Sequence, residues 1–276
     1  MFRVIATDDG SVSLFAEEYG QAMHTTDGAL TEAFVRHVLP SRVLERSTSE
    51  ITVLDVGFGL GYNALALIEA LADRENAPFA RIISLEKDLS HLDLMESIRF
   101  EGRRAGLYGF VKLAAKNGHA CEGGVDLTVL AGDARSTLRS LSNERFDAVF
   151  HDPYSPAANC ELWTVDFFRE IGARCAATAI LTTYSSAPQA RGALLESGFC
   201  IGRGPSLGRK REGTLASPSA SALEAFSVDE IAELQLNPKS SPYRDDGLNN
   251  ARDAIRAQRS AEMKDRRLKR GPQARR

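Results

Sequence analysis

Residues 53–63 (VLDVGFGLGYN) constrain the possible fold more than any other part of this sequence. Three glycines alternate within them: Gly57, Gly59 and Gly61. They follow one apolar run and precede another, and glycine at such a place permits a tight turn and the close approach of a ligand. We therefore expect a strand at 51–56, a glycine turn, and a helix at 63–71.

Apolar segments of strand length alternate with segments of helical periodicity along most of the chain. The further expected strands are 81–85, 127–130, 146–151 and 179–184, with a terminal strand pair at 199–202 and 213–217. The further expected helices are 89–105, 134–141, 162–174 and 187–197. Such alternation is typical of proteins in which helices wrap both faces of a mainly parallel sheet. The sequence therefore predicts a doubly wound, Rossmann-like α/β fold.

Three parts are expected along the chain. Residues 1–48 form a small N-terminal extension, with a strand at 11–15 and a helix at 30–38. Residues 49–220 form the sheet domain, and residues 221–276 form a helical tail with helices at 228–234 and 248–268. The net charge of the whole chain is −3, yet residues 251–276 carry ten basic and three acidic side chains. Such a tail either contacts RNA phosphates or is a solvated terminus.

The composition argues against several classes of protein. The four cysteines are widely spaced, and the five histidines form no HxxxH or HExxH pattern, so we expect no disulfide framework and no bound metal. No apolar run approaches the roughly 18–20 residues of a membrane span, and the N-terminus lacks the apolar stretch of a signal peptide. We therefore expect a cytoplasmic protein that does not enter a membrane.

Acidic residues mark the ends of the first three expected strands, where such sheets bind ligands. Asp55 precedes the turn, Glu86 ends the second strand, and Asp133 follows the third. A dinucleotide fingerprint would need glycine where Tyr62 stands, which argues against NAD or FAD. A carboxylate beside the turn suits the amino group and sulfonium of S-adenosylmethionine, while Glu86 can accept hydrogen bonds from ribose and Asp133 from adenine. Each acid alone is also a common helix cap, but together they favour S-adenosylmethionine.

The fourth expected strand leads into residues 152–163 (DPYSPAANCELW). This stretch is similar to the D-x-F-x-P-x-x-N-P-x-x-W motif of the MnmC-like methyltransferases, the methyltransferase half of enzymes that make 5-methylaminomethyl-uridine at the tRNA wobble position. The turn resembles their G-F-G-T-G-x-N, which adds Asn63 to the expected cofactor site. The segments DGSVSLF, GALTEA, GRKREGTLAS and PYRD also resemble parts of that family. Cys160 stands where the family usually has Pro, and Tyr154 stands where Phe is common.

The resemblance implies an N-methyltransferase that acts on the aminomethyl group of the wobble uridine. It implies that Asp152 orients the amine and accepts its proton, and that Tyr154 and Trp163 stack on the flipped base. Asn159 belongs to the same block and is expected to bind substrate. Loop packing is the alternative role for the two aromatic residues.

The basic segment Arg209, Lys210 and Arg211 is expected to hold phosphates of the tRNA anticodon region, or else to be a solvated turn. No flavin-binding domain is expected in this chain, so a separate enzyme would supply the aminomethyl-uridine. Two other functions stay open. One is a class I methyltransferase or an aminopropyltransferase-like enzyme that acts on a small amine or another RNA site. The other is a non-catalytic nucleoside- or RNA-binding module, against which the intact acidic residues argue.

Overall fold

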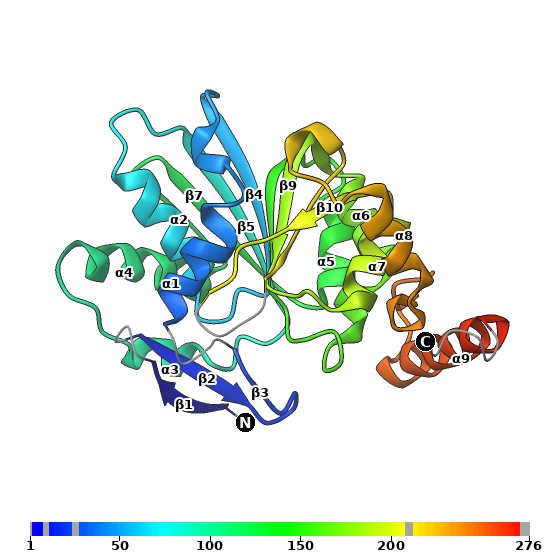
Figure 1. Ribbon diagram of the computed structural model, residues 1–276. Coiled ribbons are helices and arrows are strands. Elements are labelled where there is room, and N and C mark those ends of the chain that lie inside the picture. The colour runs from blue at the N-terminus through cyan, green and yellow to red at the C-terminus, as the bar shows by residue number, and fades with distance from the viewer. Residues whose placement is uncertain (1, 8–10, 24–27, 208–211, 271–276) are drawn as a thin grey trace.

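An eight-stranded sheet forms the centre of the molecule, with helices on both of its faces (Figure 1). The computed structural model describes residues 2–7, 11–23, 28–207 and 212–270. The strands of the large sheet are β4 (Glu50–Val56), β5 (Phe79–Glu86), β6 (His119–Glu122), β7 (Val125–Ala131), β8 (Phe146–His151), β9 (Cys175–Thr183), β10 (Cys200–Arg203) and β11 (Thr214–Ser217). Their order across the sheet is β10-β11-β9-β8-β4-β5-β7-β6.

The middle of the sheet is parallel and its edges are antiparallel. Strand β4 pairs in parallel with β5 on one side and with β8 on the other, and β7 and β9 extend this parallel core. The edge strands β10 and β6, and the inner strand β11 next to β10, run antiparallel to their neighbours. The chain therefore leaves β4 toward one side and returns on the other, which opens a crevice at the carboxyl end of β4. The predicted doubly wound α/β fold is confirmed.

Helices cover the two faces of the sheet in two groups. One face carries α1 (Ala29–Ala33) with the π-helical turn η1 (Phe34–Val38), α2 (Tyr62–Ala72), α3 (Leu92–Ser97) and α4 (Gly102–Asn117). The other carries α5 (Ala134–Ser140), α6 (Val165–Gly172) and α7 (Pro188–Glu196). The short 3-10 turns are η2 (Val43–Glu45), η3 (Cys160–Trp163), η4 (Ala220–Ala222) and η5 (Pro238–Ser240).

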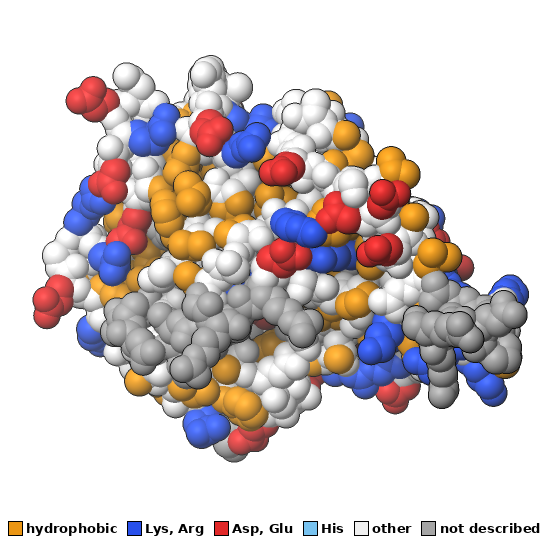
Figure 2. Space-filling model, in the orientation of Figure 1, with side chains coloured by type: hydrophobic (Ala, Val, Ile, Leu, Met, Phe, Trp, Pro, Cys, Tyr) orange, Lys and Arg blue, Asp and Glu red, His pale blue; other side chains and the backbone are white. Residues whose placement is uncertain are grey.

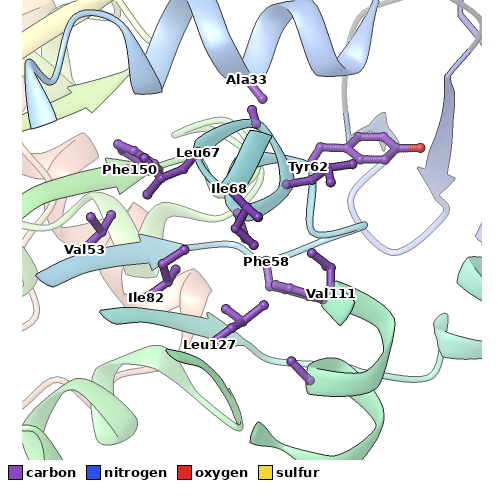
Figure 3. Packing of buried hydrophobic residues seen from close by; sticks show 14 of the residues in the cluster. Ala33, Val53, Phe58, Tyr62, Leu67, Ile68, Ile82, Val111, Leu127 and Phe150 are labelled. Carbon is purple, nitrogen blue, oxygen red and sulfur yellow. The ribbon is translucent and has the colours of Figure 1, made fainter. Parts of the chain in front are cut away.

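Alternation along β4 decides which side chains reach which face. Val53 packs in the cluster under α2 and α4, whereas Leu54 and Val56 pack on the opposite face. Figure 3 shows this first cluster, in which Val53 lies beneath α2 and Phe58 points from the turn toward Val111 of α4. The same alternation places Asp55 on the α2 side, which matters for the site below.

The structure corrects two of the expected helices. The single helix expected at 89–105 is two helices, because Ile98 is extended and Gly102 has a φ of 58°. The helix expected at 162–174 begins at Val165 instead, because the hydroxyl of Thr164 accepts a hydrogen bond from the N–H of Phe167 and caps α6. The strands β1 and β6 were not expected from the sequence.

The N-terminal residues form a small sheet of their own. It consists of β1 (Phe2–Ala6), β2 (Val12–Ala16) and β3 (Gln21–Ala22), paired antiparallel. In Figure 1 it lies below the large sheet, across the end where the turn after β4 emerges. This sheet therefore covers the edge at which a doubly wound fold binds ligands.

The C-terminal tail is docked onto the sheet domain. It contains α8 (Val228–Leu236) and α9 (Arg252–Arg270), which lies at the far right of Figure 1. Asp245, in the loop that joins these helices, is fully buried, and its carboxylate accepts hydrogen bonds from Arg135 Nη1 (2.7 Å) and from the N–H groups of Asn249 and Asn250. The N–H of Val165 donates to the carbonyl of Tyr243. The PYRD segment thus fastens the tail to α5 and α6.

Within the part of the chain that the structure describes, no helix has both the length and the apolar character needed to cross a membrane. The same residues contain no group of three His, Cys, Asp or Glu side chains arranged to hold a metal ion.

Candidate active site

A pocket of about 840 Å³ opens between the carboxyl ends of the parallel strands and the N-terminal sheet. Residues from both parts line it, so the N-terminal sheet forms one wall and the strand ends form the other. The pocket brings together these sequence-predicted residues: Gly57, Gly59, Glu86, Asp133, Asp152, Tyr154 and Asn159.

The glycine turn allows two close approaches of backbone and side chain. At Gly57 the φ is +95°, and a Cβ would stand 2.8 Å from the carbonyl oxygen of Asp152. At Gly61, which begins α2, a Cβ would stand 2.5 Å from Val111 and 2.8 Å from Phe58. Only Gly57 of these two lines the pocket. The turn thus lets β8 approach β4 at the site, and Gly61 serves packing rather than direct ligand contact.

Asp55, which was expected to contact the cofactor, lies beneath the turn and does not line the pocket. Its side chain is completely buried, and it accepts hydrogen bonds from Ser84 Oγ (2.8 Å) and Asn63 Nδ2 (3.2 Å). Burial raises the pKa of Asp55 to about 7, although both hydrogen bonds oppose that rise. Asp55 therefore supports the site from behind through Asn63.

Asn63 connects the buried carboxylate to the one in the pocket. It sits in the first turn of α2, and its Nδ2 donates to Asp55 Oδ1 and to Asp152 Oδ2, each at 3.2 Å. Its side chain does not line the pocket described above. Asn63 therefore fixes the position of Asp152 and does not reach the cofactor space.

Glu86 and His91 hold the turn from the other side. The N–H of Gly59 donates to Glu86 Oε2 at 2.9 Å, and the N–H of Asp88 donates to Glu86 Oε1 at 3.1 Å. The buried His91 donates from Nε2 to the carbonyl of Gly59 at 2.5 Å. His91 was not predicted, because no spacing motif marks an isolated histidine that bonds to backbone.

Asp133 caps α5 and pairs with Arg135. Its carboxylate accepts from the N–H of Arg135 (2.9 Å) and from the Arg135 guanidinium (2.7 Å), which also contacts Asp245. Burial raises the pKa of Asp133, but the hydrogen bonds from Arg135 outweigh burial and keep that pKa below its usual value. The residue lines the pocket as an anchored carboxylate.

The mouth of the pocket is closed by contacts between the β2–β3 hairpin and the loop after β8. The rings of Tyr19 and Tyr154 stack with centroids 4.1 Å apart and an interplanar angle of 16°. Gln21 Nε2 donates to Ser155 Oγ at 2.7 Å, and the guanidinium of Arg252 lies over the Tyr19 ring at 5.0 Å. No local sequence pattern predicts these contacts, because they join three parts of the chain that are far apart.

Trp163, which was expected to stack on a base, does not line the pocket. Its ring is fully buried, packs edge-on against His151, and donates from Nε1 to the carbonyl of Tyr154 at 2.8 Å. Burial lowers the pKa of His151 to about 4, so that ring is neutral near pH 7. Trp163 therefore shapes the loop that carries Tyr154.

The remaining predicted contacts divide between the pocket and the segments outside it. Asn159 lines the pocket, is mostly buried, and donates from Nδ2 to Glu161 at 3.2 Å. The basic residues Arg209, Lys210 and Arg211 lie outside the described residues.

Three residues that the sequence did not single out surround Asp152. Glu32 and Tyr184 line the pocket with it, and Tyr184 donates from its hydroxyl to the carbonyl of Pro153 at 3.0 Å. Burial raises the pKa of Tyr184, and the negative charges of Asp152 and Glu32 add to that rise. Behind Asp152 lies His37, with its Nε2 3.6 Å from Asp152 Oδ1. The alternation on β8 that places Phe150 under α1 also turns Asp152 to that side.

The pocket suits a ligand with hydroxyl and amino groups. The buried Oη of Tyr154 has no hydrogen-bond partner among the described residues, and burial raises the pKa of this phenol. The carboxylates of Glu86 and Asp133 stand in the same wall, where they can accept hydrogen bonds from a nucleoside. The chemistry of these donors and acceptors fits S-adenosylmethionine.

The fold and this pocket define a class I methyltransferase, and comparison with known proteins agrees. A family model for S-adenosyl-L-methionine-dependent methyltransferases matches residues 107–219. The crystal structure of MnmC2 from Aquifex aeolicus superimposes with a TM-score of 0.86 at 34% identity, over 96% of this chain and 86% of that one. The chain belongs to the MnmC2 family of S-adenosylmethionine-dependent methyltransferases.

Two curated relatives extend the comparison. A protein of Methanocaldococcus jannaschii is 31% identical over 97% of this chain and 75% of its own length. The tRNA 5-methylaminomethyl-2-thiouridine biosynthesis bifunctional protein MnmC of Burkholderia vietnamiensis is 31% identical over 74% of this chain. The match covers only 33% of that bifunctional protein, so the chain corresponds to about a third of it.

Proposed function

We propose that this methyltransferase transfers a methyl group to the amine of 5-aminomethyl-uridine at the wobble position of tRNA. The observation that carries the proposal is Asp152, which emerges at the end of β8 into the pocket, beside the glycine turn. The bifunctional relatives are named for the biosynthesis of 5-methylaminomethyl-2-thiouridine in tRNA, which supports this acceptor.

The proposed cofactor contacts follow the strand ends. Glu86 would accept hydrogen bonds from the ribose hydroxyls, Asp133 from the adenine amino group, and the backbone at Gly57 and Gly59 would permit close approach. S-adenosylmethionine supplies an electrophilic methyl group on a positively charged sulfur. The buried pair of Asp55 and Asn63 keeps the floor of this site rigid.

The proposed acceptor site lies around Asp152. A primary amine can form a new bond only when its lone pair is free, so a carboxylate that orients the amine and takes up a proton favours the reaction. Glu32 lines the same wall, and its carboxylate is paired with Arg36 at 3.1 Å. An unstacked uracil would stack on the Tyr154 ring in place of Tyr19, which now covers it.

Basic residues of the tail are the proposed contacts for the tRNA backbone. Figure 2 shows Lys and Arg side chains gathered around the α9 end of the visible face. Arg252 pairs with Glu161, and Arg259 donates to the carbonyl of Ser241, so both are held by the body of the protein. Lys264 and Arg267 remain exposed on the same helix. With Arg209–Arg211, these exposed residues would make binding depend strongly on salt.

The proposal also requires a second activity. Methyl transfer to nitrogen does not build the bond between the uracil ring carbon and the aminomethyl group, so another enzyme must supply the aminomethyl-uridine. A tRNA substrate would place the reaction in the cytoplasm.

Nucleoside mass spectrometry tests the acceptor. The protein is incubated with isotopically labelled S-adenosylmethionine and tRNA from a strain that lacks its gene. We expect label in 5-methylaminomethyl-uridine, and none when the tRNA lacks the aminomethyl group. Label in another nucleoside, or only in a small amine such as spermidine added as a control, would contradict the proposed acceptor.

A further inference from the structure

His37 is a buried histidine beside Asp152 that the proposed chemistry does not yet use. Its side chain is 1% exposed, and its Nε2 lies 3.6 Å from Asp152 Oδ1. This nitrogen has no hydrogen-bond partner within the described part of the chain. The ring is therefore closed to solvent, and its Nε2 faces the carboxylate of Asp152, which lines the pocket.

The backbone that carries His37 is unusual. Residues Phe34–Val38 form a π-helical turn, in which the N–H of Leu39 donates to the carbonyl of Phe34 at 2.9 Å. Such turns are rare and occur frequently at functional sites, because they change the direction of a side chain within a helix. Here the turn places the His37 ring against Phe150 of β8, with centroids 5.7 Å apart.

The other ring nitrogen is fixed by Thr182. Its Oγ1 lies 2.9 Å from His37 Nδ1 and 3.3 Å from the carbonyl of Val149, to which it can donate its single hydrogen. In that arrangement Nδ1–H donates to Thr182, and a neutral ring presents the lone pair of Nε2 to the Asp152 carboxylate. One proton placed between those two acceptors converts a repulsive contact into a charge-assisted hydrogen bond.

Charged and titratable groups from several elements surround the His37–Asp152 pair. The titratable and charged groups around the His37–Asp152 pair come from its own helix, from β4, from the end of β8 and from the residue after β9: Glu32, Arg36, Asp55, His151 and Tyr184. Arg36 is paired with Glu32, at 3.1 Å between Arg36 Nε and Glu32 Oε1. The charge of Glu32 is therefore balanced, and Asp152 is the carboxylate that His37 Nε2 faces.

We propose that His37 acts through Asp152: the two side chains share the proton that the acceptor amine loses. The inference rests on the proposed function, because it needs an amine acceptor. The nitrogen–carbon bond forms with the lone pair of the amine, and the carbon–sulfur bond breaks with its electron pair left on sulfur. The resulting secondary ammonium loses one proton to Asp152 Oδ1, and this proton is then shared with His37 Nε2. His37 is thus a positioning residue and Asp152 is the group that meets the substrate.

The first test measures the pair without any acceptor. Protein labelled with 15N-histidine is titrated by NMR, and the His37 signals are assigned by their loss in His37→Gln. We expect the pH dependence of the His37 signals to differ between the wild type and Asp152→Asn, because the variant lacks the carboxylate that faces His37 Nε2. Signals with the same pH dependence in both proteins would overturn the proposal.

The second test measures transfer as a function of pH in single-turnover reactions. In His37→Gln we expect the rate to fall at least about tenfold and to keep rising to higher pH than in the wild type, because the proton must leave to solvent. Thr182→Val, which loosens the ring but keeps both titratable groups, should give a smaller change in the same direction. The matched control is His119→Gln on the edge strand β6, whose profile should equal that of the wild type.

These tests separate the two proposals. If nucleoside analysis finds no methylated aminomethyl-uridine, the proposed acceptor fails, while the NMR titration still decides whether His37 and Asp152 share a proton. A His37→Gln enzyme that folds, binds S-adenosylmethionine with wild-type affinity and keeps the wild-type rate and pH profile would refute the role of His37.

Discussion

Gln21 and Ser155 exchange two hydrogen bonds across the mouth of the pocket, although 134 positions separate them in the sequence. Gln21 Nε2 donates to Ser155 Oγ at 2.7 Å, and the N–H of Ser155 donates to Gln21 Oε1 at 3.2 Å. The contact ties the N-terminal sheet to the loop that follows Asp152. The pocket wall therefore depends on a contact between the N-terminal sheet and the loop after β8 of the large sheet.

Gln21→Ala should weaken the closure of this pocket. Loss of two hydrogen bonds worth about 1 kcal/mol each predicts a dissociation constant for S-adenosylmethionine raised about threefold to thirtyfold. Isothermal titration calorimetry measures this, with Glu17→Gln as control, since Glu17 is exposed on the same hairpin. An unchanged affinity in Gln21→Ala would show that this contact has no part in binding.

Gly57→Ala should destabilise the protein more than Gly59→Ala. Both glycines have positive φ, but a Cβ at Gly57 would meet the Asp152 carbonyl at 2.8 Å, whereas at Gly59 the nearest atom is the Met23 sulfur at 3.5 Å. We expect the free energy of unfolding to fall by about 2–4 kcal/mol in the first variant and about 1–2 kcal/mol in the second. Urea denaturation compares them, and equal losses would argue against the close approach.

Asp152→Asn should abolish transfer while it spares the cofactor. The variant keeps the shape of the side chain but cannot accept a proton, so we expect the single-turnover rate to fall about 10²–10⁴-fold. The dissociation constant for S-adenosylmethionine should stay within about threefold of the wild type, because the proposed ribose and adenine contacts are elsewhere. Asp93→Asn, an exposed acid in α3, is the control, and full activity in Asp152→Asn would reject the catalytic assignment.

Asp55→Asn should change how stability depends on pH. Burial raises the pKa of Asp55 to about 7 from 3.8, so between these values the folded protein holds a proton that the unfolded chain has released. The free energy of unfolding of the wild type therefore falls as pH rises through this window. Relative to the wild type, the variant should gain about 2–3 kcal/mol between pH 5 and pH 8. Urea titrations at several pH values test this, and a constant difference would contradict the buried ionisation.

Trp163→Phe should lower stability without a direct loss of RNA contact. The change removes the hydrogen bond to the Tyr154 carbonyl and part of a fully buried ring, which predicts a loss of about 1–3 kcal/mol in the free energy of unfolding. At a temperature where the variant is folded, its affinity for tRNA should stay within a few-fold of the wild type. A large loss of tRNA affinity in a stable variant would restore the role in base stacking.

Part of the site was predictable because its signals are local. Strand ends are marked by apolar runs, and in a parallel sheet all these ends meet at one edge, so Glu86, Asp133 and Asp152 were placed in one pocket from their positions alone. The direction in which a side chain points is not encoded in these local signals. Asp55 and Trp163 sit at the right ends of their segments, yet one faces the core under α2 and the other packs behind its loop.

His37, Tyr19 and Gln21 had no local signal. Each reaches the site from the N-terminal residues, and each depends on a partner more than a hundred positions away: Thr182, Tyr154 and Ser155. Spacing motifs detect residues held by one turn or one helix, so they do not reveal pairs made by docking of separate segments. For the same reason, the sequence does not reveal the contact between Asp245 and Arg135 that holds the tail in place.

The sequence by itself determined the doubly wound fold, the glycine turn and the acidic residues at the strand ends, because hydrophobic period and glycine placement act over a few neighbouring residues. Only the tertiary structure decided which of those acids face the pocket, what closes its mouth, and that a buried histidine stands behind Asp152. These features depend on the face of the sheet to which each side chain points and on contacts between segments that are far apart in the sequence. A local sequence pattern encodes neither.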